Sequence, residues 1–299
     1  MFDHHSFKHK FILPALAKMP AGIGYHLVRF IGRWYFQFYE KNWVRDYHNG
    51  LKEVFKEVEP KVIRKWVKSH LSMMAMEELD VYSLKTMNER NFMEWVDFDL
   101  PQDFLAPQGD AGSGASGKII VTGHAGRTIL LSALGLAGFP CGVFTMGVKG
   151  NPNLSAWQQA YLSFKMHTAM EKMGGHWLTD QDNYRKIFRT LKEGESLVIA
   201  ADVGATKKEK SSFYPFLGGK VSVSNGIARL AEKTGADLYY AQILQDENDY
   251  KVRIRIRPLD EAPEMALEEA FQLLERDIRR APWLWWQWNG LRSIWSPLD

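Results

Sequence analysis

Strand-like and helix-like segments alternate along most of this chain, from residue 118 to residue 280. Short apolar runs such as KIIVTG and SLVIAAD are typical of buried strands, and amphipathic segments of helical length separate them. The predicted strands are 118–123, 140–146, 176–178, 196–202, 237–245 and 250–258. The predicted helices are 126–138, 154–173, 181–193, 222–234 and 264–280. This order predicts an α/β domain with a mostly parallel central sheet flanked by helices, and its last two strands read as an antiparallel hairpin at the sheet edge.

The amino-terminal segment has a different character, because apolar and aromatic residues are mixed there with lysines and arginines. The sequence FKHKFILPALAKMPAGIGYHLVRFIGRWYFQFYEKNW lacks the compact apolar core and cleavage site of a signal peptide. It fits an amphipathic segment lying on an anionic membrane surface, and it equally fits a buried helical hairpin that covers the domain. We therefore predict a membrane-docking segment over residues 1–48 and the α/β domain over residues 49–299.

Composition and charge exclude several classes of function. The net charge of +3 and the lack of a basic stripe with interleaved aromatics argue against nucleic acid as a partner. Histidines and the single cysteine do not occur at metal-ligand spacing, and no nucleotide-binding loop is recognisable, so no metal and no cofactor are expected. Eleven tryptophans suit contact with a membrane or lipid, and they suit a tryptophan-rich core as well.

Polar residues follow two of the predicted strands, where ligands bind in open α/β sheets. His124 comes after the strand 118–123, and Asp202 ends the strand 196–202. Because a helix is predicted to begin directly after His124, its dipole is expected to keep the imidazole neutral and able to accept a proton. Arg127 and Thr128 in the first turn are expected to bind an anion or a developing oxyanion. A hydrogen-bonded structural histidine is the alternative for His124.

Lysines cluster in the loop after Asp202. Lys207, Lys208 and Lys210 flank Glu209 there. Such a patch is able to attract an anionic donor over a long range, whereas a solvated loop of mixed charge is the simpler interpretation.

Three features together resemble the lipid A biosynthesis lauroyl/myristoyl acyltransferase family, within the lysophospholipid acyltransferase superfamily. They are the strand followed by Gly-His, the stretch LVIAADVGATKKEKSSFYPFLGGKVSVSNGIARLAEKTGADLYYAQI, and the carboxy-terminal LERDIRRAPWLWWQWNG. The resemblance covers roughly residues 50 to 290. It implies that His124 takes a proton from a lipid hydroxyl, which then attacks a thioester on acyl carrier protein or coenzyme A.

The chain departs from the family pattern at the acid of the catalytic pair. Relatives carry Asp or Glu five positions after the histidine, and this chain has Ile129. One explanation is an acid from elsewhere, for which Asp202 and Glu77 are the candidates. A second is transfer involving an amine, as in the branch that moves an aminoacyl group such as glycyl from a carrier protein onto lipid A. A third is a relative that binds lipid or carrier without turnover.

A second departure lies near the carboxy terminus. Gln287, Trp288 and Asn289 stand where relatives often carry basic residues. Trp286 and the neighbouring tryptophans are expected to contact the acyl tail or the bilayer, or else to pack against the sheet. We therefore expect an acyltransferase with a carrier-protein or CoA thioester as donor and a membrane glycolipid such as lipid A as acceptor. The resemblance places it peripherally on the cytoplasmic face of the bacterial inner membrane.

Overall fold

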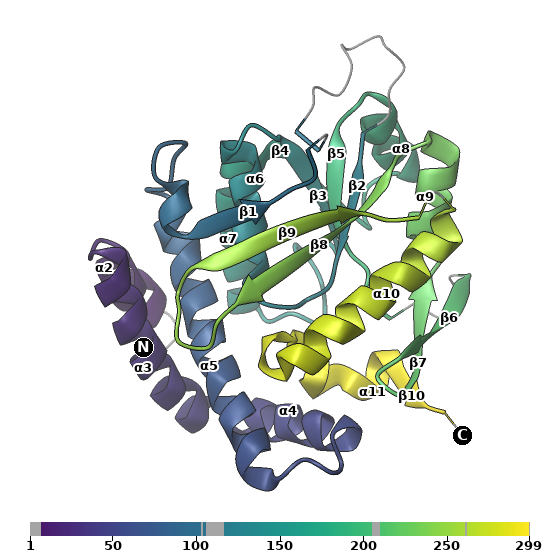
Figure 1. The fold of residues 1–299 in the computed structure, drawn as a ribbon. Coiled ribbons are helices and arrows are strands. Elements are labelled where there is room, and N and C mark those ends of the chain that lie inside the picture. Colours follow the sequence, from purple (N-terminus) through teal and green to yellow (C-terminus); the bar gives the residue numbers. More distant parts are fainter. Residues whose placement is uncertain (1–6, 103, 106–116, 205–209, 261, 299) are drawn as a thin grey trace.

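The computed structural model describes residues 7–102, 104–105, 117–204, 210–260 and 262–298. In this part of the chain, seven strands form one sheet in the order β1-β9-β8-β2-β5-β3-β4 (Figure 1). Their bounds are Val96–Asp99 for β1, Ile119–Thr122 for β2, Cys141–Thr145 for β3, Gly174–Thr179 for β4, Ser196–Ala200 for β5, Leu238–Gln245 for β8 and Val252–Pro258 for β9. Five neighbouring strands are parallel, and β9 and β1 run in the opposite direction. The predicted α/β fold with a mostly parallel sheet is confirmed.

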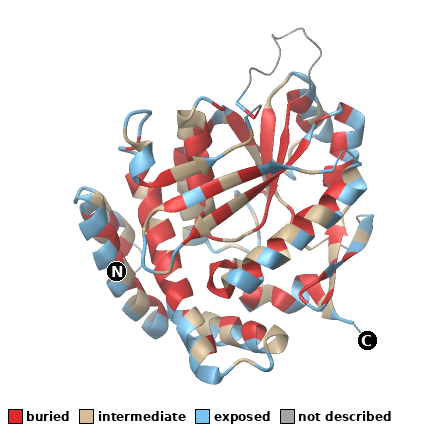
Figure 2. Ribbon diagram, in the orientation of Figure 1, coloured by how far each residue is buried: buried red, intermediate tan, exposed pale blue. Residues whose placement is uncertain are grey.

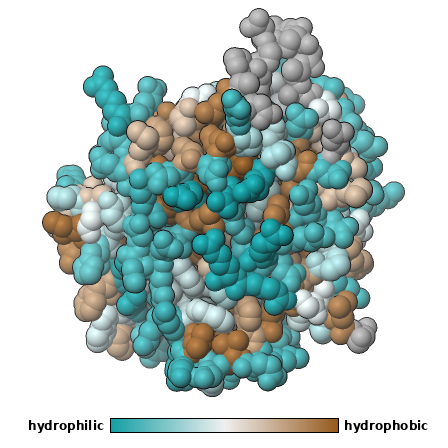
Figure 3. All heavy atoms as spheres, viewed as in Figure 1, coloured by the Kyte–Doolittle hydropathy of each residue, from teal (hydrophilic) through white to brown (hydrophobic). Residues whose placement is uncertain are grey.

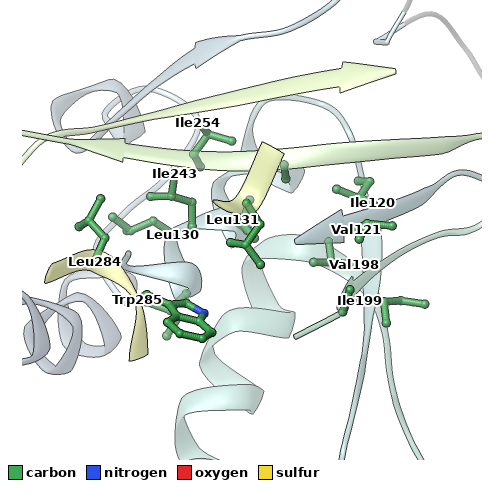
Figure 4. Packing of buried hydrophobic residues seen from close by; sticks show 14 of the residues in the cluster. Ile120, Val121, Leu130, Leu131, Val198, Ile199, Ile243, Ile254, Leu284 and Trp285 are labelled. Atoms are coloured by element: carbon green, nitrogen blue, oxygen red, sulfur yellow. The ribbon is translucent and has the colours of Figure 1, made fainter. Parts of the chain in front are cut away.

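Helices cover both faces of this sheet. One face carries α5 (Pro60–Ser83), α6 (Ala133–Leu136) and α7 (Ala156–Met173), and the other carries α8 (Tyr184–Lys192), α9 (Gly226–Thr234) and α10 (Pro263–Arg280). Because both faces are covered, the central strands β2 and β5 are continuous apolar runs instead of alternating ones. Figure 4 shows their side chains packed with those of the loop after β2 and of the carboxy-terminal segment.

The predicted hairpin at the sheet edge is partly wrong. β8 and β9 do pair antiparallel, but β1 pairs with the outer side of β9 and is the edge strand. The sequence of β1, VDFD, is too short and too polar to stand out as a strand. Its acidic side chains are instead matched to β9, where Asp99 accepts a hydrogen bond from Arg255 at 2.5 Å.

A second, three-stranded sheet was not predicted. It consists of β6 (Ser211–Phe216), β7 (Gly219–Ser224) and β10 (Trp295–Pro297). Leu217 and Gly218 connect β6 to β7 with φ of 52° and 73°, as in the tight hairpin turns that match strand twist. The backbone N–H of Leu217 donates to Glu275 of α10 at 2.7 Å, which anchors this turn to the main domain. The predicted helix 222–234 accordingly starts only at Gly226.

The segment after His124 also differs from its prediction. Instead of one helix over 126–138, there is a 3₁₀-helix, η3 (Thr128–Ser132), followed by the single turn of α6. Gly126 has a φ of 75°, a left-handed conformation that interrupts a helix and favours glycine. Neither segment is long enough to give His124 the strong helix dipole that the sequence predicted.

The amino-terminal part is helical. It comprises the π-helix η1 (Lys8–Ile12), then α2 (Leu13–Leu16), α3 (Ala21–Tyr39) and α4 (Lys41–Val54), so residue 48 falls inside a helix. α3 packs closely on α5, because a Cβ at Gly32 would lie 2.1 Å from that of Ala75. Across the described ranges, no helix has the length and apolar character needed to traverse a bilayer.

Candidate active site

His124 and Asp202 meet because their strands are neighbours in the sheet. β2 and β5 pair in parallel with Thr122 opposite Ala200, and each polar residue comes two positions later. Gly123 makes this close approach possible, since a Cβ there would lie 2.6 Å from Leu274 of α10 and 3.3 Å from the Asp202 carboxylate. The sheet register therefore brings together two of the predicted residues.

The two residues form an imidazole–carboxylate dyad. His124 Nδ1 lies 2.7 Å from Asp202 Oδ1, and the backbone N–H of His124 donates to Oδ2 at 2.8 Å. Asp202 is fully buried, whereas 40% of the His124 side chain is exposed. Since an ionised carboxylate only accepts hydrogen bonds, Nδ1 carries the proton and Nε2 is left as the basic nitrogen. This leaves the imidazole reachable from outside.

The pKa values of the dyad follow from this geometry. Burial alone would lower the pKa of His124, but the charge and hydrogen bond of Asp202 outweigh it and raise that pKa above 6.5. Burial alone would raise the pKa of Asp202, but His124 and the indole of Trp285 hold it below 3.8. The helix dipole expected from the sequence therefore does not set the pKa of His124, because a carboxylate in contact with the ring outweighs two short helical turns.

A carboxy-terminal segment holds the loop that carries His124. Ala125 forms an antiparallel bridge with Trp285, and the backbone N–H of Trp286 donates to the carbonyl of His124 at 2.8 Å. The indole of Trp285 donates to Asp202 Oδ2 at 2.8 Å. Gln287 lies 3.3 Å from His124 Nδ1, and because that nitrogen is protonated, the amide of Gln287 donates to the Asp202 carbonyl at 3.4 Å. Contacts of Trp285 and Gln287 with the dyad were not predicted.

Glu77 belongs to a second polar group near His124. Its Oε1 accepts a hydrogen bond from Lys165 of α7 at 2.5 Å and lies 3.5 Å from the hydroxyl of Thr128. Its Oε2 is buried with no hydrogen-bond partner. Both charges act on the imidazole, because Lys165 lowers and Glu77 raises the pKa of His124. The partner of the imidazole is nevertheless Asp202, and no sequence pattern marked Lys165 in advance.

Arg127 lies in the interior, away from the surface where a ligand would arrive. Its guanidinium is fully buried and binds Asp80 of α5, with Nε to Oδ2 at 2.9 Å. It also donates to the carbonyl of Tyr250 at 2.5 Å, and Asp80 accepts a hydrogen bond from Tyr25 of α3 at 2.5 Å. The expected anion-binding arginine is therefore occupied by a buried ion pair that ties α3 and α5 to the loop after His124.

The remaining predicted contacts are only partly described. Lys210 is exposed just before β6, whereas Lys207 and Lys208 lie outside the described residues. Trp286 is half-buried, and its indole donates to the carbonyl of Gly126 at 2.9 Å. Trp283, Trp285 and Trp288 pack inside the protein. In the part of the chain that the structure describes, no cluster of three or more histidine, cysteine or acidic side chains is arranged to hold a metal ion.

This arrangement is an α/β fold with an imidazole–carboxylate dyad at the carboxyl ends of a mostly parallel sheet. The sequence profile of the bacterial lipid A biosynthesis acyltransferase family matches residues 7–289. The chain therefore belongs to this family, which confirms the resemblance found in the sequence. No curated protein matches the chain significantly. Membership implies an acyl donor, a lipid acceptor and association with a membrane.

Proposed function

We propose that the protein transfers an acyl group from a carrier thioester to a hydroxyl or amine of a membrane lipid such as lipid A. The observation that carries this proposal is the dyad, in which His124 is accessible and Asp202 is buried behind it. Nε2 of His124 accepts the proton of the acceptor O–H or N–H while that oxygen or nitrogen attacks the thioester carbonyl. The C–S bond then breaks, and the imidazolium returns the proton to the leaving thiolate.

Asp202 supplies the function that an acid at position 129 would have in relatives. Its hydrogen bond to Nδ1 fixes the tautomer, and its charge stabilises the imidazolium that forms in the transition state. Ile129 is apolar and buried in η3, so no second acid at that position competes with Asp202 for the imidazole. Arg127 has no place in this mechanism, because its guanidinium is occupied by Asp80. Thr128 is half-buried and hydrogen-bonds Glu77, so both side chains are proposed to line the place where the acceptor or donor binds.

Membrane docking is proposed for the outer face of α3. Ile23, Leu27, Phe30, Trp34 and Phe38 recur at helical spacing and are 37% to 64% exposed. The opposite face of α3 is buried against the domain, and Figure 2 shows this division along the helix. In Figure 3, brown and tan atoms lie among teal ones at the edge formed by α2 and α3. An apolar helix surface of this kind fits the interfacial region of a bilayer. We propose that it docks on the cytoplasmic side of the inner membrane.

The donor is proposed to be an acyl carrier protein or acyl-CoA, both of which are anionic. The exposed Lys210 belongs, with Lys207 and Lys208, to the loop that follows Asp202. Positive side chains that follow Asp202 this closely in the sequence would attract such a donor before contact.

Aminoacyl transfer from a carrier protein is the second candidate. It is favoured by Glu77, whose Oε2 is buried near His124 without a hydrogen-bond partner. A carboxylate oxygen in that position is able to accept a hydrogen bond from the ammonium group of an aminoacyl donor. A fatty acyl group has no such donor to offer.

The test is the turnover of the purified protein and of His124→Ala with lauroyl- and glycyl-loaded carrier protein and a lipid A precursor in detergent micelles. We expect the wild type to form product and the variant to lose at least about a thousandfold in rate, since the base and its positioning are both removed. The melting temperature of the variant serves as the control for folding. Full activity in the variant, or no turnover of either donor by the wild type, would contradict the proposal.

A further inference from the structure

The carboxy-terminal segment Leu284–Gln287 contacts both members of the dyad, although it lies more than 80 residues from Asp202 in the sequence. Two of its contacts are backbone hydrogen bonds to the loop after β2, from Gly126 N–H to the carbonyl of Leu284 and from Trp286 N–H to the carbonyl of His124, each at 2.8 Å. Such contacts fix the loop itself. The contact of the Trp285 side chain is different, because it reaches past the loop to the carboxylate.

Both oxygens of Asp202 have defined partners. Oδ2 accepts hydrogen bonds from the Trp285 indole and from the backbone N–H of His124, each at 2.8 Å. Oδ1 is thereby directed at His124 Nδ1, 2.7 Å away. Without the indole donor, the carboxylate would keep a single anchor on Oδ2 and would gain freedom to rotate about its χ2 angle, which has a broad energy well.

The surroundings of Trp285 hold the indole itself in place. The side chain is fully buried, and its ring packs edge-on against Phe216 at 5.6 Å and Trp288 at 4.7 Å between centroids. Figure 4 shows it next to Leu284 at the border of the apolar cluster that surrounds the sheet. The donor is thus rigid, and it lies in a region where hydrogen bonds to a charge are strong.

We infer that Trp285 is a positioning residue, whose indole N–H orients the Asp202 carboxylate and thereby sets the tautomer and direction of His124. This inference rests on the proposed function only for its kinetic consequence. Trp285 acts through Asp202 and itself touches neither donor nor acceptor. A tryptophan in a tryptophan-rich stretch thereby gains a specific role beyond packing.

Trp288 provides a matched control. It is equally buried, and its indole donates to the carbonyl of Pro282 at 2.7 Å, away from the dyad. Trp285→Phe and Trp288→Phe therefore each remove one buried indole hydrogen bond and a similar volume. Both variants should lose melting temperature, Trp285→Phe more so because its hydrogen bond is to a charge. Trp288→Phe keeps an aromatic ring next to Trp285, so only Trp285→Phe should lower kcat, by roughly tenfold to a hundredfold, with little change in KM.

A double-mutant cycle separates positioning from packing. If Trp285 acts through Asp202, the change Trp285→Phe should cost less than about twofold in kcat when Asp202→Asn is already present. A purely structural role would give the same loss in both backgrounds. Equal losses would overturn the inference.

A measurement on the free protein makes the outcome independent of turnover. In proton NMR spectra, a fixed contact between His124 Nδ1 and a carboxylate gives a far-downfield proton resonance. We expect this resonance in the wild type and in Trp288→Phe, and its loss in Trp285→Phe. If Trp285→Phe keeps it, the inference is wrong, whereas a wild type that shows it but lacks turnover refutes only the proposed function.

A variant that fails to fold would not end the test. In the otherwise native chain, Asp202→Asn removes the charge that the Trp285 indole faces. The Trp285 indole proton should then shift upfield, and the Trp288 indole proton should stay where it is. An unmoved Trp285 resonance would overturn the inference.

Discussion

His124 and Arg127 lie three residues apart in the sequence, and each pairs with an aspartate, but the two ion pairs have opposite surroundings. His124 is paired with a buried carboxylate but is itself 40% exposed, whereas both Arg127 and Asp80 have no exposed side-chain surface. The first pair is able to exchange a proton with an incoming molecule. The second joins the loop after β2 to α5 and, through Tyr25, to α3. Residue type and position suggested chemistry for both, and accessibility distinguishes them.

Complete burial of the Arg127–Asp80 pair affects the free energy of unfolding, which can be measured. Burial raises the pKa of Asp80 to about 6, although Arg127 and Tyr25 oppose the rise. An arginine that compensates such a carboxylate stabilises the fold, and its removal leaves a charge in the interior. The pair at His124 faces solvent on one side, so the charge of the imidazole is partly hydrated.

The largest expected effect is on stability. Arg127→Met should lower the free energy of unfolding by about 3–5 kcal/mol, because Asp80 loses its buried partner. Chemical denaturation measures the loss. The matched control is Arg127→Met combined with Asp80→Leu, which should recover most of the stability, since an apolar pair replaces the ionic one. If Arg127→Met is as stable as the wild type and has a raised KM for the donor, Arg127 binds a ligand. The proposed contrast between a structural Arg127 pair and a reactive His124 pair would then be wrong.

A smaller effect is expected on the outer face of α3, the helix that the buried pair ties down through Tyr25. Phe30→Ser should weaken binding to vesicles containing anionic phospholipid by roughly tenfold, because an aromatic ring no longer enters the interface. Sedimentation with vesicles measures the binding. Phe213→Ser is the control, since Phe213 on β6 is also 64% exposed but lies outside the α3 stripe. Equal losses in both variants would argue against α3 as the docking face.

Much of the fold was predictable, because buried strands and amphipathic helices leave a local pattern in the sequence. The meeting of His124 and Asp202 was partly predictable as well, since both follow strands of a parallel sheet. The pairing register that places them opposite each other is a tertiary property. β1 and the hairpin of β6 and β7 were missed for the same reason, as their stability comes from neighbours instead of local pattern.

The site residues that were missed have a common cause. Lys165 is one of several lysines on helix surfaces, and Trp285 is one of four tryptophans in a short stretch. Nothing local distinguishes a tryptophan that donates to Asp202 from one that donates to Pro282. Arg127 was wrongly assigned to ligand binding, because its burial depends on Asp80 of α5, a helix far away in the sequence.

The central claim is that Asp202 holds His124 as a base, and the pKa of that imidazole tests it most directly. NMR titration of the His124 ring should give a pKa above 6.5 in the wild type, because the carboxylate outweighs burial. In Asp202→Asn burial remains the largest influence, with the opposing charges of Lys165 and Glu77 beside it, so the pKa should fall below 6.5, a total change of about one unit or more. The activity of the wild type should rise with pH through the same raised pKa, as expected for a base that works in its neutral form. An unchanged His124 pKa in Asp202→Asn would contradict the dyad.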